Sequence, residues 1–255
     1  PAGWFENGVL QMTMRNFDNA VSQYDVAMSM YEDDNKPDKA NVSQQLINES
    51  LSGKGSDLMA QGEFEQACAL FNKMYMESGS LGHGFKTAGC FQAANQMEAA
   101  NIIFMSLIRD FPDSIDVHME FFSVLKKLKR TKQAQQLLID FVDTTNTDDH
   151  RILSRLASTY MATEDYDKAL EIIAKAKPRY LENGKLNDDY PLGFLFLEGS
   201  ALTSLERYDE AQTVFEQTVA KAPDLLGAQL ELYNVLKKQN DDHSMVVLME
   251  AYQQF

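Results

Sequence analysis

Hydrophobic positions recur along most of the chain with the spacing of amphipathic helices, at i, i+3, i+4 and i+7. Leu195 and Gly199 lie on one such stripe. After a short polar turn, Ala211 and Phe215 lie on the facing stripe of a second helix. Pro223 follows that second helix, which it cannot continue because proline lacks the backbone N–H. The pattern therefore predicts pairs of helices packed as hairpins, and an all-α fold.

The predicted hairpins repeat with a period near 34 residues. Each has a small residue on its first helix, an alanine twelve residues later, and a bulky apolar residue four positions further on. The anchor alanines are Ala20, Ala67, Ala100, Ala134, Ala169 and Ala211. Their separations are 47, 33, 34, 35 and 42 residues, so two intervals hold inserts. With a degenerate unit centred on Met245, the period predicts one domain over residues 1–255, an array of about seven helix–turn–helix units.

This arrangement resembles the tetratricopeptide repeat (TPR) family from Trp4 to Tyr252. The resemblance is strong around four anchors and weak around Ala134, where Phe122 replaces the small residue. It implies an α-α superhelix, a TPR-like solenoid in which the first helix of each unit lines a concave groove. An unrelated helical bundle is the alternative.

The two inserts span about residues 28–49 and 177–191. The first holds an acidic stretch between apolar periods, which predicts longer helices joined by an acidic loop. In the second, Pro178 should end or kink a helix, and Pro191 suits the first turn of the next one. Inserts in repeat arrays map to loops on one face, either as tolerated surface loops or as part of a binding face.

The charge of the chain excludes some classes of partner. There are 23 Lys and Arg against 38 Asp and Glu, a formal net charge of −15. Such a chain repels phosphate backbones and anionic lipid, so we expect no nucleic-acid binding. No apolar run approaches the ~20 residues of a membrane span, so we expect no direct membrane insertion. Two cysteines are too few for a disulfide scaffold; this usage favours a cytoplasmic protein, with the bacterial periplasm or cell envelope as the alternative.

Residue patterns for catalysis are missing from the sequence. The four histidines have no His or Cys at metal-ligand spacing, and the motifs of metalloproteases, hydrolases and P-loop enzymes are absent. Cys68 and Cys90 are expected to be buried apolar residues; they lie on neighbouring repeats, so whether they pair stays open. The acidic segment 143–149 lacks the central glycine of a calcium loop and is expected to cap the next helix. We expect no enzyme activity, no metal and no cofactor.

The resemblance also suggests which residues would face the groove. The candidate peptide-binding residues are Phe85, Ser123, Lys126, Arg151, Arg155, Ser158 and Phe196. Arg151 and Arg155 are i, i+4 neighbours, so their guanidinium groups could hold a carboxylate or an acidic peptide segment.

Each part of this site has a plainer interpretation. The basic residues around Lys126 would form a solvated turn paired with Asp140, Asp143 or Glu120, and Phe196 would be buried. The family's carboxylate clamp is not supported, because Glu120 stands where that clamp needs a neutral or basic residue.

The leading hypothesis is a non-catalytic protein–protein interaction scaffold or adaptor that binds a peptide or partner helix in its groove. The alternative is a structural subunit of a larger assembly that docks through its convex face or its terminal repeats. Self-association through the apolar C-terminal repeat around Met245 would favour that alternative.

Overall fold

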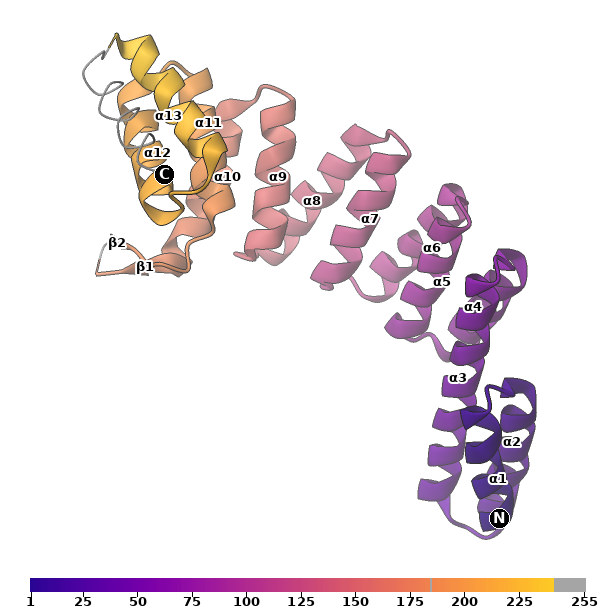
Figure 1. The fold of residues 1–255 in the computed structure, drawn as a ribbon. Helices are drawn as coiled ribbons and strands as arrows, with labels where there is room; N and C mark the ends of the chain where they lie inside the picture. The colour runs from indigo at the N-terminus through magenta and orange to yellow at the C-terminus, as the bar shows by residue number, and fades with distance from the viewer. Residues whose placement is uncertain (184, 241–255) are drawn as a thin grey trace. The chain divides into compact units, whose positions relative to one another are not determined.

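The computed structural model describes residues 1–183 and 185–240. In this part the chain forms thirteen α-helices, one 3-10 helix and one two-stranded β-hairpin (Figure 1). The predicted all-α, TPR-like solenoid fold is confirmed. The chain divides into two compact units, residues 1–130 and 131–255. Of the repeat centred on Met245, the described residues hold only the first helix, so that repeat and the single array over 1–255 stay predictions.

Unit 1 is a run of seven helices in which each helix contacts the next. The helices are α1 (Ala2–Thr13), α2 (Phe17–Asp33), α3 (Pro37–Ala60), α4 (Phe64–Ser78), α5 (Leu81–Ala93), α6 (Met97–Asp110) and α7 (Ile115–Lys127). The first insert lengthens two of them: α2 has 17 residues, α3 has 24, and only a short polar turn separates them.

Unit 2 contains six helices in its described part and the only strands found there. The elements are α8 (Thr131–Thr145), α9 (His150–Ala162), α10 (Tyr166–Ala176), η1 (Lys177–Tyr180), β1 (Leu181–Glu182), β2 (Lys185–Leu186), α11 (Leu192–Ser204), α12 (Tyr208–Lys221) and α13 (Leu226–Gln239). Consecutive helices pack together, and the first helix α11 also contacts the first helices α9 and α13.

Small residues of the first helices lie directly against aromatic rings of the second helices. A Cβ atom built on Gly8 would come within 2.6 Å of the Tyr24 ring, and one built on Gly199 within 2.6 Å of the Phe215 ring. Both aromatic residues are fully buried. The sixteen-residue spacing seen in the sequence is therefore the spacing between a helix backbone and the ring that packs on it.

The turns inside the hairpins share one backbone conformation. Five residues before each anchor alanine, one residue has a positive φ between 57° and 81°: Arg15, Gly62, Asn95, Lys129, Glu164 and Glu206. Only Gly62 adopts this left-handed region without steric cost from a Cβ atom. The regular position explains why the alanines keep their register whichever residue occupies the turn.

The second insert folds back on α11 and α12. The strands β1 and β2 are antiparallel, with Leu181 opposite Leu186 and Glu182 opposite Lys185. Lys221 of α12 donates hydrogen bonds to the backbone carbonyl oxygens of Tyr190, at 2.6 Å, and of Asp188. The segment is thus held to the unit by these lysine contacts as well as by its own pairing.

A buried tyrosine anchors the same insert. The Tyr190 ring stacks on Phe194 with 5.7 Å between ring centroids and meets Tyr180 edge-on at 5.4 Å. Burial, and then the negative charge of Glu198, raise the pKa of the Tyr190 hydroxyl. The tyrosine therefore stays neutral as a packing residue of the insert.

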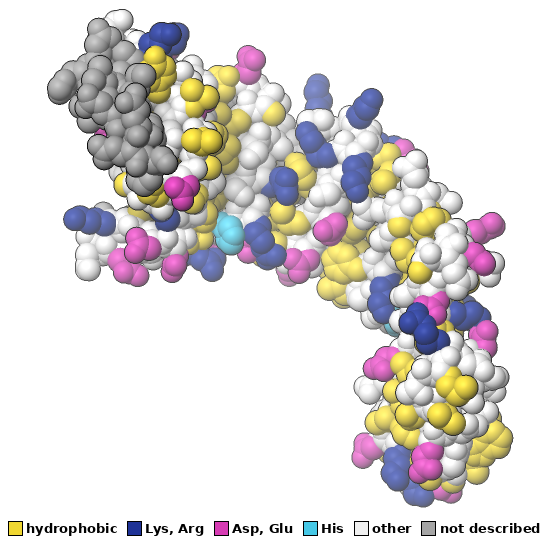
Figure 2. Space-filling view, viewed as in Figure 1, with side chains coloured by type: hydrophobic (Ala, Val, Ile, Leu, Met, Phe, Trp, Pro, Cys, Tyr) yellow, Lys and Arg dark blue, Asp and Glu magenta, His cyan; other side chains and the backbone are white. Residues whose placement is uncertain are grey.

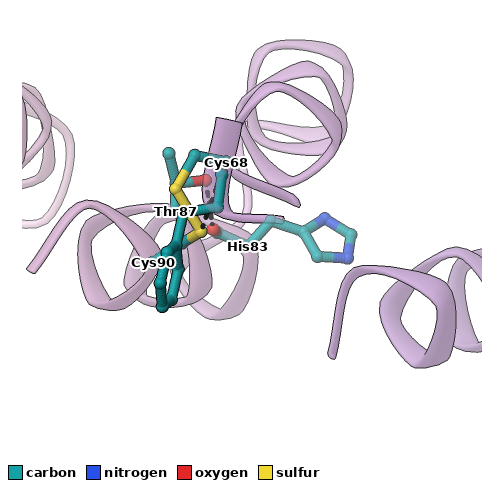
Figure 3. Close-up of a disulfide and its surroundings, with 5 residues drawn as sticks. Cys68, His83, Thr87 and Cys90 are labelled. Carbon is teal, nitrogen blue, oxygen red and sulfur yellow. Dashed lines mark hydrogen bonds between the residues drawn. A yellow bond between two sulfur atoms is a disulfide. The ribbon is translucent and has the colours of Figure 1, made fainter. Parts of the chain in front are cut away.

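Cys68 and Cys90 form a disulfide between α4 and α5, with their Cα atoms 5.4 Å apart (Figure 3). Both side chains are buried in a cluster with Ala67, Phe71 and Met74. Beside it, the Thr87 hydroxyl donates to the carbonyl oxygen of His83 at 2.8 Å, as Figure 3 shows. The two cysteines therefore pair, which the sequence left open, and the bond covalently joins two consecutive repeats.

Candidate functional site

The seven candidate binding residues lie on first helices, in both units. Phe85 is on α5, and Ser123 and Lys126 are on α7, all in unit 1. In unit 2 the candidates are Arg151, Arg155, Ser158 and Phe196, three on α9 and one on α11. The candidates thus form two groups, one per unit.

The acidic segment before α9 caps that helix. Oδ1 of Asp149 accepts a hydrogen bond from the backbone N–H of Arg151 at 2.9 Å. The guanidinium of Arg151 also donates to this carboxylate, from Nε at 3.2 Å and from an Nη at 3.3 Å. Partial burial raises the pKa of Asp149, but the hydrogen bonds and charge of Arg151 outweigh it, so the pKa lies below its ordinary value. The ionised cap fixes Arg151 at the start of the helix.

Arg151, Arg155 and Ser158 occupy one exposed stripe of α9, as their spacing predicts. The residues between them pack into unit 2. Ser158 donates its hydroxyl proton to the carbonyl oxygen of Ser154 at 2.7 Å. Toward a ligand, Ser158 can therefore only accept a hydrogen bond, whereas the two arginines bring positive charge.

An apolar surface continues from this stripe onto α11 and α13. The half-buried Phe196 packs edge-on against Phe215 at 6.0 Å and lies beside Gly227 of α13. On the first turns of α13, Leu226 is 76% exposed and Leu230 is 59% exposed. Figure 2 shows hydrophobic side chains on the visible surface of these helices.

We call the side formed by Arg151, Arg155, Ser158, Phe196, Leu226 and Leu230 the first-helix face of unit 2. Leu226 was missed as a candidate in the sequence, although its i, i+4 spacing to Leu230 on an exposed stripe was a usable signal.

The candidates in unit 1 are engaged in packing and in local hydrogen bonds. The half-buried Phe85 meets Phe104 edge-on at 6.2 Å, and Phe104 stacks on Phe121 at 5.8 Å. The Ser123 hydroxyl donates to the carbonyl oxygen of Met119 at 3.0 Å. Lys126 is exposed. Phe85 therefore belongs in part to the core of unit 1.

Two residues of the basic run next to Lys126 connect neighbouring repeats. Arg130 donates to both carboxylate oxygens of Glu98, each at 2.9 Å, and Lys127 donates to the side chain of Gln92 at 3.1 Å. These partners differ from Asp140, Asp143 and Glu120, which the sequence suggested, because the turn packs against the preceding repeat.

No group of three or more His, Cys, Asp or Glu side chains in residues 1–183 and 185–240 is placed to hold a metal ion. His118 is buried, with Nδ1 2.9 Å from the carbonyl oxygen of Ser114, and burial lowers its pKa. No helix in the same residues is long and apolar enough to cross a bilayer.

Known proteins share this repeat and this fold. Family models described as tetratricopeptide repeat match residues 84–114 and 152–179, one in each unit. No curated protein sequence matches the chain.

Solved structures with the same fold have low sequence identity. YrrB, described as a TPR protein with an unusual peptide-binding site, aligns with a TM-score of 0.51 and 17% identity over 70% of this chain and 88% of its own. MamA from Desulfovibrio magneticus RS-1 aligns with a TM-score of 0.55 and 11% sequence identity, over 67% of this chain and 92% of its own. The structure of Naa15/Naa10 bound to HypK-THB aligns with a TM-score of 0.57 and 12% sequence identity, over 99% of this chain but only 36% of that one. At these identities the likeness concerns the fold. The chain thus contains a tetratricopeptide repeat in each unit and has the fold of these structures.

Proposed function

We propose that the chain is a non-catalytic protein–protein interaction scaffold, and that the first-helix face of unit 2 binds a peptide or a partner helix. One observation carries the proposal: α9, which presents the exposed arginines, and α13, which presents the exposed leucines, both contact α11. Apolar anchors next to basic side chains suit a partner segment that carries leucine-like and acidic residues. The description of YrrB as a TPR protein with a peptide-binding site supports the same type of ligand.

Affinity capture followed by mass spectrometry tests this proposal. The bait is the whole chain, compared with an Arg151→Ala/Arg155→Ala double variant and a Leu226→Ser/Leu230→Ser double variant. We expect the same polypeptide partner to be lost from both, because each variant removes one half of the face. Lys175→Ala, an exposed change on α10, is the matched control. Identical partner profiles for all four proteins would refute the proposed face.

A structural role is the second candidate, favoured by the outer surface of α1. Leu10 is 54% exposed and Met14 is 66% exposed at i, i+4 spacing, with Trp4 and Val9 nearby on the same helix. Figure 2 shows hydrophobic side chains gathered over the N-terminal helices. Such an exposed apolar patch suits docking into a larger assembly.

Analytical ultracentrifugation over a range of concentrations tests this second candidate. Association that disappears in a Leu10→Ser/Met14→Ser variant would support terminal docking over face binding. The C-terminal repeat around Met245, the other candidate for association, lies largely outside the described residues.

A further inference from the structure

The second insert borders an open cavity that the repeat pattern does not predict. Its volume is about 800 Å³, and it lies between the β-hairpin and the helices α11 and α12. The walls come from the insert, which includes Lys177 of η1, and from two helices of the next repeat. All of these elements belong to unit 2. The cavity is therefore a feature of one compact unit and is separate from the first-helix face.

Apolar and polar residues both line the cavity. Leu195 and the Tyr190 ring are buried, Leu186 is half-buried, and Ala220 adds a small side chain from α12. At the rim, Leu181 is 48% exposed. The Tyr190 hydroxyl is buried and has no hydrogen-bond partner within the described part of the chain. Because this hydroxyl is buried, a ligand does not reach it, and the apolar surface that the walls offer comes mainly from Leu181 and Leu186.

The charged groups on the walls are mostly lysines. Lys177 is paired with Glu198 at 2.5 Å, so its charge is balanced. Lys221 uses two of its three N–H donors on backbone carbonyl oxygens, which leaves its charge and one donor. Lys185 is exposed, and Asp188 is the one acidic residue among the lining residues. In a chain of net charge −15, this wall is locally basic and suits an anionic group.

The exposure of the cavity to solvent points to a peptide rather than a small molecule. A small ligand is held by burying roughly 70–90% of its surface, which a cleft that is open to solvent does not provide. A peptide segment can place one apolar side chain inside and continue along the rim. A carboxylate on the same peptide would meet Lys185 and Lys221.

We propose that this cavity is a second recognition site, which binds an extended peptide segment with alternating apolar and acidic residues. The apolar side chain packs against Leu181 and Leu186. The neighbouring carboxylate pairs with Lys185 and with the remaining donor of Lys221. The site shares no residue with the first-helix face, because its lining comes from the insert, from Leu195 of α11 and from α12.

Fluorescence anisotropy with the whole chain tests the proposal. The probe is a short fluorescein-labelled, amidated peptide of alternating leucine and glutamate. We expect Lys185→Glu to weaken its binding about fivefold or more, because charge reversal removes an attraction and adds a repulsion. Ala220→Phe, which fills the cavity without changing charge, should weaken binding by a similar factor. Binding should also weaken as salt is raised.

Three matched comparisons decide the outcome. Lys175→Glu carries the same charge reversal on α10 away from the cavity, and it should leave binding unchanged. Arg155→Glu alters the first-helix face, so a loss in Arg155→Glu but not in Lys185→Glu would overturn the cavity site while leaving the proposed function in place. A peptide with lysine in place of glutamate should not bind.

Two further results would also overturn the proposal. One is equal binding of the leucine–glutamate peptide by Lys185→Glu, Ala220→Phe and the unchanged chain. The other is binding of decanoate to the cavity without any binding of the peptide. Circular dichroism melts of each variant separate loss of binding from loss of fold.

Discussion

At the scale of single residues, the packing of two helices in a repeat depends on a position where no side chain larger than glycine fits without a shift. Gly199 leaves room for the Phe215 ring on the facing helix, whereas Gly193, on the same helix α11, faces open space. We therefore expect an added methyl group to be resisted at Gly199 and tolerated at Gly193. Periodicity alone could not separate them, because both occupy ordinary helical positions.

We expect Gly199→Ala to lower the free energy of unfolding by about 1–3 kcal/mol, because the new Cβ would lie 2.6 Å from the Phe215 ring. Gly193→Ala, its matched control, should raise it by roughly 0.5–1 kcal/mol through helix propensity. Urea unfolding followed by circular dichroism measures both changes. Equal effects of the two substitutions would contradict the packing argument.

The left-handed turn residues give a second residue-scale prediction. Gly62 has a φ of +81°, and a Cβ atom added there would meet no neighbouring atom within 4 Å, so only backbone strain opposes an alanine. Gly62→Ala should cost about 1–2 kcal/mol of stability. The reverse change, Glu164→Gly, relieves the same strain at a φ of +61° and should raise the midpoint of urea unfolding. A gain from Gly62→Ala would refute this interpretation of the turns.

At the scale of elements, the disulfide between α4 and α5 closes a loop, with a sequence separation of 22 residues. Because the bond restricts the unfolded chain, reducing it should lower the free energy of unfolding by roughly 3 kcal/mol. Urea unfolding with and without reductant measures this, and a Cys68→Ala/Cys90→Ala variant should be insensitive to reductant. Two thiols that react with maleimide in the denatured, unreduced chain would show that the bond is absent.

The histidines of α5 and α7 make stability depend on pH. Burial lowers the pKa of His118 and that of His83, so the folded state favours their neutral forms. Their contribution to the free energy of unfolding is complete above the ordinary histidine pKa of about 6.5. It falls as the pH drops below that value, because the unfolded chain then binds more protons than the folded chain. Thermal melts should show a lower midpoint in mildly acidic buffer than at neutral pH. His118→Gln should flatten this dependence in part, whereas His150→Gln, an exposed change, should not alter it.

Most of the elements could be predicted from the sequence, because helix periodicity and the spacing of Gly199, Ala211 and Phe215 record contacts between adjacent helices. The partners of exposed charges could not. Arg130 pairs with Glu98, 32 positions away, through packing between repeats, and no local pattern encodes that pairing. The cavity was equally hidden, because the insert has no period and is placed by Lys221 and by the stacked Tyr190.

At the scale of the whole molecule, the two compact units should respond to local change separately. In a repeat array each element contacts mainly its neighbours, so a disturbance spreads over short distances. Gly199→Ala should therefore speed amide hydrogen exchange in unit 2 and leave residues 1–130 unchanged. Reduction of the disulfide should speed exchange within residues 1–130 and leave unit 2 unchanged. Mass spectrometry of peptic fragments measures both, and uniform acceleration along the chain would show a single cooperative body.

The bond between Cys68 and Cys90 has a mechanical consequence. If the two ends of the chain are pulled apart in optical tweezers, the stretch between the sulfur atoms cannot lengthen while the bond is intact. A separation of 22 residues corresponds to roughly 75 Å of contour length, and that length should be missing from the fully extended tether. Adding reductant during the pull should release it in one step. With the bond intact, the segment between the two cysteines cannot be drawn out, whereas the repeats on either side of it can.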